Sequence, residues 1–260
     1  MLKKLIKYDL IWINKSMVVF FVISLLISCI TRGISLVNDT FVGNILYIVF
    51  KSLTISCIVS IVINCAIRIW NRFRLNIYKD ESYLTHTLPI KRNTLYKSKI
   101  ISSFVSIIIS LVFVLISFII VFLDNKMIDK LKDIFSNNDV AFIFVLLLVL
   151  MVLEVLYMTY CGILGLIIGH RSNNNKMVKS VVFGLALYFM IQIVIFIIIL
   201  SIGLLNPDMS SLFSNTINED INFISAVKKL VLIVNITYIV FTTGLCISGK
   251  LLFKNGINIE

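Results

Sequence analysis

The residues of this chain that could support acid–base, nucleophilic or metal chemistry are few and scattered. The two histidines, His86 and His170, have no cluster of carboxylates at ligand spacing around them. The five cysteines all fall within apolar runs, without metal-ligand spacing and outside any expected outer loop: Cys29, Cys57, Cys65, Cys161 and Cys246. The motifs G-x-x-x-x-G-K-[ST], H-E-x-x-H, G-x-S-x-G and C-x-x-C are missing. We therefore expect no catalytic residue, no metal site, no disulfide and no cofactor in this chain.

One carboxylate stands apart because of its surroundings. Glu154 lies about fourteen residues from either end of the apolar run 140–169, where a charge is costly unless it is paired, hydrated or protonated. Gln192 lies at a similar depth in the next apolar run, and Tyr157 is one helical turn from Glu154. Two interpretations stay open. Glu154 is part of a polar path or a pH-sensitive gate, or it is a protonated carboxyl hydrogen-bonded to a neighbouring helix.

Small polar residues recur at helical spacing in two other apolar runs. Ser52, Ser56, Ser60 and Asn64 follow one another at intervals of four residues, and Ser102, Ser106 and Ser110 repeat the pattern. Such stripes mark either close helix packing or the lining of a polar pathway. Gly162, Gly165 and Gly169 share one helical face and predict a close backbone approach.

The elements that position these residues must be membrane helices. The chain has 260 residues, 59% of them hydrophobic and 14% charged, and a mean hydropathy of +1.03. A soluble domain has a smaller apolar share and nearly twice the charged share. The net charge of +11 comes from basic residues that flank apolar runs and form no continuous face, so we expect no nucleic-acid partner.

Six apolar runs are each about long enough to cross a bilayer. They are Met17–Leu36, Ile45–Ile67, Ile100–Leu123, Val140–Gly169, Val178–Leu205 and Leu230–Phe253. With the N-terminus inside, the inner segments hold seventeen Lys and Arg residues and the outer ones seven. The positive-inside rule then predicts that both termini are cytoplasmic.

The longest polar interval runs from Asn76 to Lys99. An acidic first turn followed by Tyr83, Leu84 and Leu88 at helical spacing predicts a short amphipathic helix over Asp80–Leu88. Pro89 ends this helix. A basic collar leads from there into the third apolar run: Lys91, Arg92, Lys97 and Lys99. A solvated loop with snorkelling lysines is the alternative interpretation.

The residues Tyr83-Leu84, Thr87-Leu88-Pro89-Ile90, Arg92 and Lys99 appear in the order found in ABC-2 type transporter permeases, between their second and third spans. The chain resembles this family over its whole length. The resemblance implies an all-α membrane fold with six transmembrane helices, an N-terminal amphipathic elbow helix, a cytosolic coupling helix and a re-entrant outer segment between spans five and six. It also implies that the segment contacts an ATPase through these residues: Asp80, Glu81, Tyr83, Leu84, Leu88, Pro89 and Arg92. Asp80 and Glu81 are expected to face basic residues of that partner.

The elbow helix is expected over residues 1–16, where lysines alternate with apolar residues and Trp12, and Lys7-Tyr8-Asp9 is similar to the family's sequence there. A cleaved signal peptide ending near Cys29 is the alternative, and the further apolar segments argue against it. The rest of the single domain is expected as spans at 17–67, a cytosolic loop at 68–99, spans at 100–169, a loop at 170–177, and spans with a tail at 178–260. Residues 124–138 predict an interfacial helix, and residues 206–229 an outer segment that dips toward the bilayer.

The resemblance implies the permease subunit of an ATP-driven exporter in a bacterial cell membrane. Its partners would be two cytosolic ATPase subunits, which hold the ATP and magnesium, a second permease subunit, identical or homologous, and membrane lipid. The expected cargo is an antimicrobial peptide, then a lipid or a drug, and the expected polar path consists of Ser52, Ser56, Ser60, Asn64, Glu154 and Gln192. A membrane sensor or scaffold that signals through an ATPase-like partner is the alternative. An intramembrane enzyme with Glu154 as its one candidate group comes third.

Overall fold

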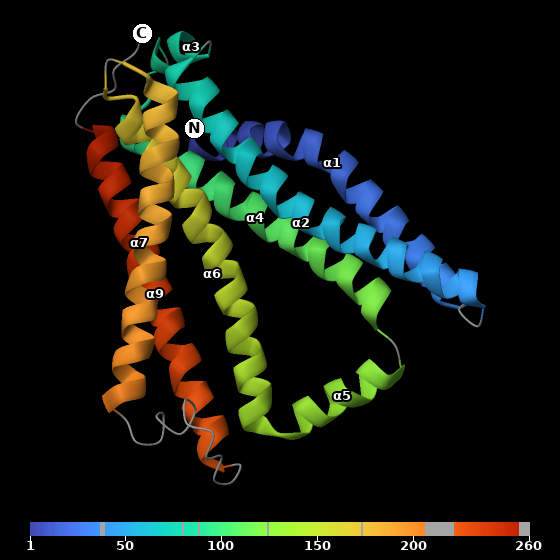
Figure 1. Ribbon diagram of the computed structural model, residues 1–260. Helices are drawn as coiled ribbons and strands as arrows, with labels where there is room; N and C mark the ends of the chain where they lie inside the picture. The colour runs from blue at the N-terminus through green and yellow to red at the C-terminus, as the bar shows by residue number, and fades with distance from the viewer. Residues whose placement is uncertain are drawn as a thin grey trace. The chain divides into compact units, whose positions relative to one another are not determined.

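The computed structural model (Figure 1) is almost wholly helical over the residues it describes, which are 1–36, 40–79, 81–87, 89–123, 125–172, 174–205 and 221–254. Within these ranges, six helices are long and apolar enough to cross a membrane. They are α1 (Leu2–Ser35), α2 (Phe41–Tyr78), α4 (Arg92–Phe122), α6 (Asn138–Gly169), α7 (Lys176–Leu205) and α9 (Ile221–Lys254). Two shorter helices are α3 (Ser82–Thr87) and α5 (Asn125–Ser136). The expected all-α architecture with six spanning candidates is confirmed.

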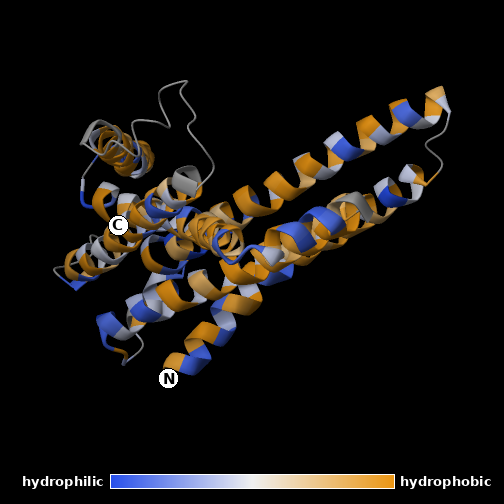
Figure 2. Ribbon diagram, turned by 90° about the horizontal axis from the view of Figure 1, so that it is seen from below, coloured by the Kyte–Doolittle hydropathy of each residue, from blue (hydrophilic) through white to orange (hydrophobic). Residues whose placement is uncertain are grey.

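Apolar side chains cover the outside of the long helices as well as the inside. Figure 2 shows hydrophobic residues along most of their length. On α7, for example, Phe189, Ile193, Phe196 and Ile197 are all exposed. Exposed apolar surface of this extent is typical of helices whose solvent is lipid. The chain divides into two compact units, the first with α1 to α4 and the second with α6, α7 and α9, and the boundary falls within α5.

In the first unit, α1 packs against both α2 and α4. The buried face of α1 contains Ile13, Met17 and Phe21, and the Phe21 ring stacks on Phe113 of α4 with centroids 4.1 Å apart. Small polar groups join the helices further along. Ser24 Oγ lies 3.3 Å from Ser117 Oγ on α4, and Thr31 Oγ1 lies 2.9 Å from Thr54 Oγ1 on α2.

The serine stripe of α4 is a packing surface. Ser102, Ser106 and Ser110 are all buried, together with Ser103. Small side chains let neighbouring helices approach closely, and a buried hydroxyl is satisfied when it donates to a carbonyl of its own helix. Ser110 Oγ donates in this way to Ile107 O at 2.8 Å, and Ser103 Oγ to Lys99 O at 2.6 Å. The packing interpretation of this stripe is confirmed.

In the second unit, α6 packs against both α7 and α9. The core is formed by buried residues from all three helices: Tyr157, Cys161, Ile191, Ile195, Val234 and Tyr238. At the opposite end of α6 from the turn that leads to α7, Lys228 Nζ lies 2.7 Å from Asp139 Oδ1 and over the Phe142 ring. This ion pair joins the first turn of α6 to the second turn of α9.

The elbow helix expected at residues 1–16 is not a separate element. Helix α1 runs from Leu2 to Ser35 without a break. The sequence offers no glycine or proline between Met1 and Gly33, so nothing in it ends the helix near Ser16.

The polar interval at 68–99 is also mostly helix. Helix α2 continues past Ile67 to Tyr78 and α4 begins at Arg92, so only residues 79–91 connect them. The expected helix over Asp80–Leu88 is present as α3, Ser82–Thr87, and Asp80 and Leu88 lie outside the described residues.

The two expected outer segments have different outcomes. The helix predicted within 124–138 is present as α5, and its interfacial position stays a prediction. Of the segment predicted to dip toward the bilayer, residues 206–220 lie outside the described residues, and from Ile221 onward the chain is the beginning of α9.

Glycines set the distance between α6 and α7. A Cβ atom added to Gly165 would lie 2.6 Å from Ser180 O and 2.7 Å from Gly184 N, and one added to Gly169 would meet the backbone of Ser180 at similarly short range. Contacts this short require the helices to move apart, because backbone atoms have no alternative rotamer. Gly162 lies close to Gly184 on the same crossing. The predicted backbone-approach face is therefore real, and its partner is α7.

We expect Gly165→Ala to lower the free energy of unfolding by about 1 to 3 kcal/mol, the usual cost of overpacking. Thermal unfolding of the purified chain in detergent measures it. The control is Gly184→Ala, whose added Cβ would lie 3.5 Å from Cys161 O, an ordinary contact. Alanine is the better helix former, so this control is expected to be neutral or slightly stabilising. Equal unfolding temperatures for the two variants would contradict the packing argument.

Candidate functional site

A buried cluster of charges joins three helices of the first unit. Asp9 of α1 is 2% exposed, and its Oδ1 accepts from Arg72 Nε of α2 at 2.9 Å and from Lys99 Nζ of α4 at 2.7 Å. Lys99 is also buried, at 4% exposed. The lysine that was expected to snorkel in a basic collar is instead the counter-ion of Asp9.

Helical spacing explains why these side chains meet. The buried positions of α1 begin with Asp9 and continue at intervals of four through Ile13, Met17 and Phe21, so Asp9 belongs to the packing face. Lys99 lies likewise in the buried stripe of α4, four residues after Leu95 and three before Ser102. Two opposite charges are thus placed by apolar neighbours at the point where α1 meets α4.

Arg72 extends the cluster to the connection between α2 and α4. While its Nε contacts Asp9, its Nη1 lies 2.7 Å from Glu81 Oε2, and Asn76 Nδ2 donates to the same Glu81 oxygen at 2.8 Å. The guanidinium carbon lies 5.2 Å from the centroid of the Trp12 ring. A planar guanidinium with several donors can hold two carboxylates and an aromatic face at once, which an ammonium cannot.

Glu81 was expected to face basic residues of an ATPase partner, but its carboxylate is bonded within its own chain. Its carboxylate points back to Arg72 and Asn76 of the same chain, because those donors lie within one helical turn of each other on α2. This bond fixes the residue that directly precedes α3. Helix α3 is consequently attached to α2 and, through Arg72, to Asp9 of α1.

The opposite face of α3 exposes two large side chains among the described residues. Tyr83 is 71% exposed and Leu84 is 73% exposed, while Ser82 beside them is buried. Pro89 and Arg92, which follow the helix, are exposed as well. The structure thus presents an adjacent aromatic and aliphatic pair on a short helix whose base is held by ion pairs.

The buried charge cluster carries a desolvation cost. Removing charges from water costs several kcal/mol per ion, and this is offset only by close partners with good geometry. Asp9 Oδ1 has two cationic donors, whereas Asp9 Oδ2 has no hydrogen-bond partner among the described residues. Loss of Asp9 would leave the buried Lys99 ammonium without its carboxylate partner, whereas loss of either cation would leave Asp9 the other one.

A second polar group lies within the spanning helices of the second unit. Glu154 lies sixteen residues after Asn138 and fifteen before Gly169, at the middle of α6. The Tyr188 phenol on α7 interacts with both the Glu154 carboxyl and the Gln192 side chain. Gln192 Nε2 also donates to Tyr238 Oη on α9 at 3.3 Å. The structure thus brings Glu154 and Gln192 together through Tyr188, as neighbours in one polar group.

Tyr157, one turn from Glu154, contacts this group through its ring and not through its hydroxyl: its ring centroid lies 6.4 Å from that of Tyr188 and 5.8 Å from that of Tyr238. It is buried in the core, where its hydroxyl donates to Leu187 O at 2.7 Å, whereas Glu154 is exposed. Three residues of helix correspond to 300° of rotation, and here the difference separates the core face from the outer face. The tyrosines whose hydroxyls contact Glu154 or Gln192 are Tyr188 and Tyr238, which the sequence analysis did not select.

The polar stripe of α2 is not a packing surface of the first unit. Ser52 and Ser56 are exposed, and Ser60 and Asn64 are half-buried. Asn64 Nδ2 donates to Ser60 O and Ser60 Oγ, so this pair is satisfied within the helix. The packing face of α2 runs instead through Thr54, Ile61 and Cys65. A role of the stripe in lining a pathway stays a prediction.

We expect Glu154→Gln to leave the free energy of unfolding within about 0.5 kcal/mol of the parental value, because an exposed amide can still hydrogen-bond Tyr188. Glu154→Leu removes that partner and is expected to be less stable than the Gln variant. Thermal unfolding in detergent compares the two. If transport depends on the charge, Gln lowers it, while unchanged transport across pH leaves Glu154 only a structural role.

Among the described residues, no group of three or more His, Cys, Asp or Glu side chains could hold a metal ion. Comparisons of the chain with protein-family models, with curated proteins and with solved structures found no match.

Proposed function

We propose that this chain is the membrane subunit of an ABC exporter of the ABC-2 type, with ATP hydrolysed by a separate pair of cytosolic ATPase subunits. The observation that carries the proposal is α3. It is a short helix between the second and third spanning candidates, it exposes Tyr83 and Leu84, and its base is held by Glu81. Exposed aromatic and aliphatic side chains on a fixed support are the usual anchors of protein interfaces.

The charge cluster gives α3 a physical connection to the spanning helices. An ATPase that displaces α3 would pull on Glu81, and Glu81 is bonded to Arg72, which is bonded to Asp9 on α1. Energetic coupling between two proteins requires an element that both partners touch and that has more than one arrangement. In this proposal α3 is that element.

The cargo path follows the polar residues of the spanning helices. Ser52 and Ser56 of α2, and Glu154 with Gln192 in the second unit, present polar groups where lipid-facing surface is otherwise apolar. The excess of Lys and Arg on one side of the spans supports cytoplasmic termini in a bacterial cell membrane. The proposed cargo is an antimicrobial peptide, ahead of a lipid or drug.

Reconstitution tests the proposal. The purified chain, alone and with a candidate ABC-type ATPase subunit, is placed in liposomes and assayed for ATP hydrolysis and for cargo movement. The expected result is hydrolysis only with the ATPase present and cargo movement only with both. An ATPase that binds the chain and hydrolyses ATP but moves no peptide, lipid or drug would favour the sensor or scaffold instead, since an exposed anchor pair serves that role equally well.

A further inference from the structure

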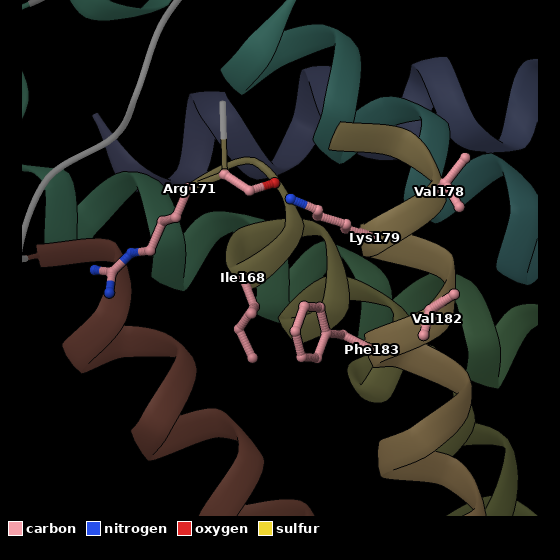
Figure 3. Close-up of a pocket in the computed structure, with 7 residues that line it drawn as sticks. Ile168, Arg171, Val178, Lys179, Val182 and Phe183 are labelled. Atoms are coloured by element: carbon pink, nitrogen blue, oxygen red, sulfur yellow. The ribbon is translucent and has the colours of Figure 1, made fainter. Parts of the chain in front are cut away.

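A shallow pocket of about 500 Å³ lies where α6 turns into α7, wholly within the second unit. It is shown in Figure 3, and it is lined by Ile168, Arg171, Ser172, Val178, Lys179, Val182 and Phe183. Its walls are mostly apolar. Val178, Val182 and Phe183 are all exposed, so the pocket opens onto the surface that α7 presents to lipid.

The polar rim of this pocket is positive. Lys179 Nζ has no hydrogen-bond or ion-pair partner among the described residues. Arg171, in contrast, turns away from the pocket toward α9 in Figure 3, and its Nη2 donates to Leu252 O at 2.6 Å. The residues 160–185 and 240–254, which form this end of the unit, contain five Lys and Arg residues and no Asp or Glu. Within these described ranges, an anion would meet positive charge that no carboxylate balances.

Along α7, the Lys179 ammonium comes first, and the apolar wall formed by Val182 and Phe183 follows one turn later. Lys179 lies one turn before Phe183, and Val178 one turn before Val182, so the two pairs form adjacent rows on one helix face. A helix rises about 5.4 Å per turn, so the surface changes from cationic to fully apolar within that distance. A phospholipid has the same order of parts, a phosphate followed by acyl chains.

We propose that this pocket binds one anionic phospholipid, with its phosphate at Lys179 and its first acyl carbons along Ile168, Val182 and Phe183. Basic pockets between spanning helices are a recurrent site for anionic headgroups. Arg171 keeps the rim in place through α9 and is not the main phosphate ligand. The proposal does not depend on the exporter function, because it requires only a membrane-embedded second unit.

Native mass spectrometry of the delipidated full chain tests the site. The chain is titrated with palmitoyl-oleoyl phosphatidylglycerol, with the matching phosphatidylcholine and with glycerol 3-phosphate. The expected result is a first phosphatidylglycerol bound more tightly than phosphatidylcholine. Lys179→Gln is expected to weaken that first binding about fivefold, which is typical for one basic residue at an anionic headgroup. Val182→Trp, which fills the apolar wall and leaves every charge in place, is expected to weaken it as well.

The control is Lys250→Gln, which makes the same charge change on an exposed residue at the same end of the unit and outside the pocket. It is expected to leave the first binding within about twofold of the parental value. Equal losses from Lys179→Gln and Lys250→Gln would overturn the proposal in favour of unspecific charge attraction. It would also fail if phosphatidylcholine bound as tightly, or if glycerol 3-phosphate displaced the lipid at equal concentration.

Discussion

Asp9→Ala is expected to lower the free energy of unfolding of this chain by about 3 to 5 kcal/mol, the range found when one partner of a buried ion pair is removed. The variant leaves the Lys99 ammonium buried without its counter-ion, and it leaves Arg72 with Glu81 as its remaining carboxylate. Thermal unfolding and the yield of monodisperse protein in detergent measure the loss.

Two further variants test whether the loss of stability in Asp9→Ala comes from breaking a buried ion pair or from removing any carboxylate. Asp139→Ala removes a carboxylate from the exposed pair with Lys228, and we expect it to cost less than about 1 kcal/mol. The double variant Asp9→Leu with Lys99→Met replaces the pair by apolar side chains of similar size, and it is expected to recover most of the stability. If Asp9→Ala proved no more harmful than Asp139→Ala, the cluster would not be what holds α1 to α4.

The double variant Tyr83→Ala with Leu84→Ala is expected to insert and fold normally, since both side chains are exposed, but to bind the ATPase poorly. Truncating one interface anchor often costs about 2 kcal/mol or more, which corresponds to roughly a 30-fold weaker complex. Pull-down affinity and cargo export in liposomes are the measurements, with unfolding temperature as the check on folding.

The matched control is Thr87→Ala, another exposed position on α3. It is expected to leave binding nearly unchanged, as is Asp80→Asn, because rim groups contribute little. A double-alanine chain that binds its ATPase and exports at the parental rate would show that α3 is not the coupling element, and the exporter assignment would lose its main support.

The sequence predicted the spanning helices well because their signal is local. Each apolar run is about long enough for a crossing, and glycine spacing at Gly162, Gly165 and Gly169 marked the α6 face that α7 approaches. Helix ends were predicted less well. Lysines among apolar residues in the first fifteen positions fit an interfacial helix and the start of a spanning helix equally, so the continuity of α1 was missed.

The charge cluster was missed because its members are far apart in the chain. Asp9 and Lys99 are separated by 90 residues, and Glu81 was interpreted as a contact to a partner and not as a partner of Arg72. One signal was available. Asp9 occupies the apolar register of Ile13 and Met17, and a carboxylate on a packing face requires a cation from another helix. For Glu154, the register of α6 alone did not show that Tyr188 would be its neighbour.

The separation of Asp9 from Lys99 also has a consequence for the order in which the protein is assembled. The ribosome makes α1 first, and at about 5 to 20 residues per second Lys99 is added roughly 5 to 20 s after Asp9. Over that interval the Asp9 carboxylate has no lysine from α4 to meet. The bond between the first and third spanning segments can therefore form only after the beginning of α4 has been made.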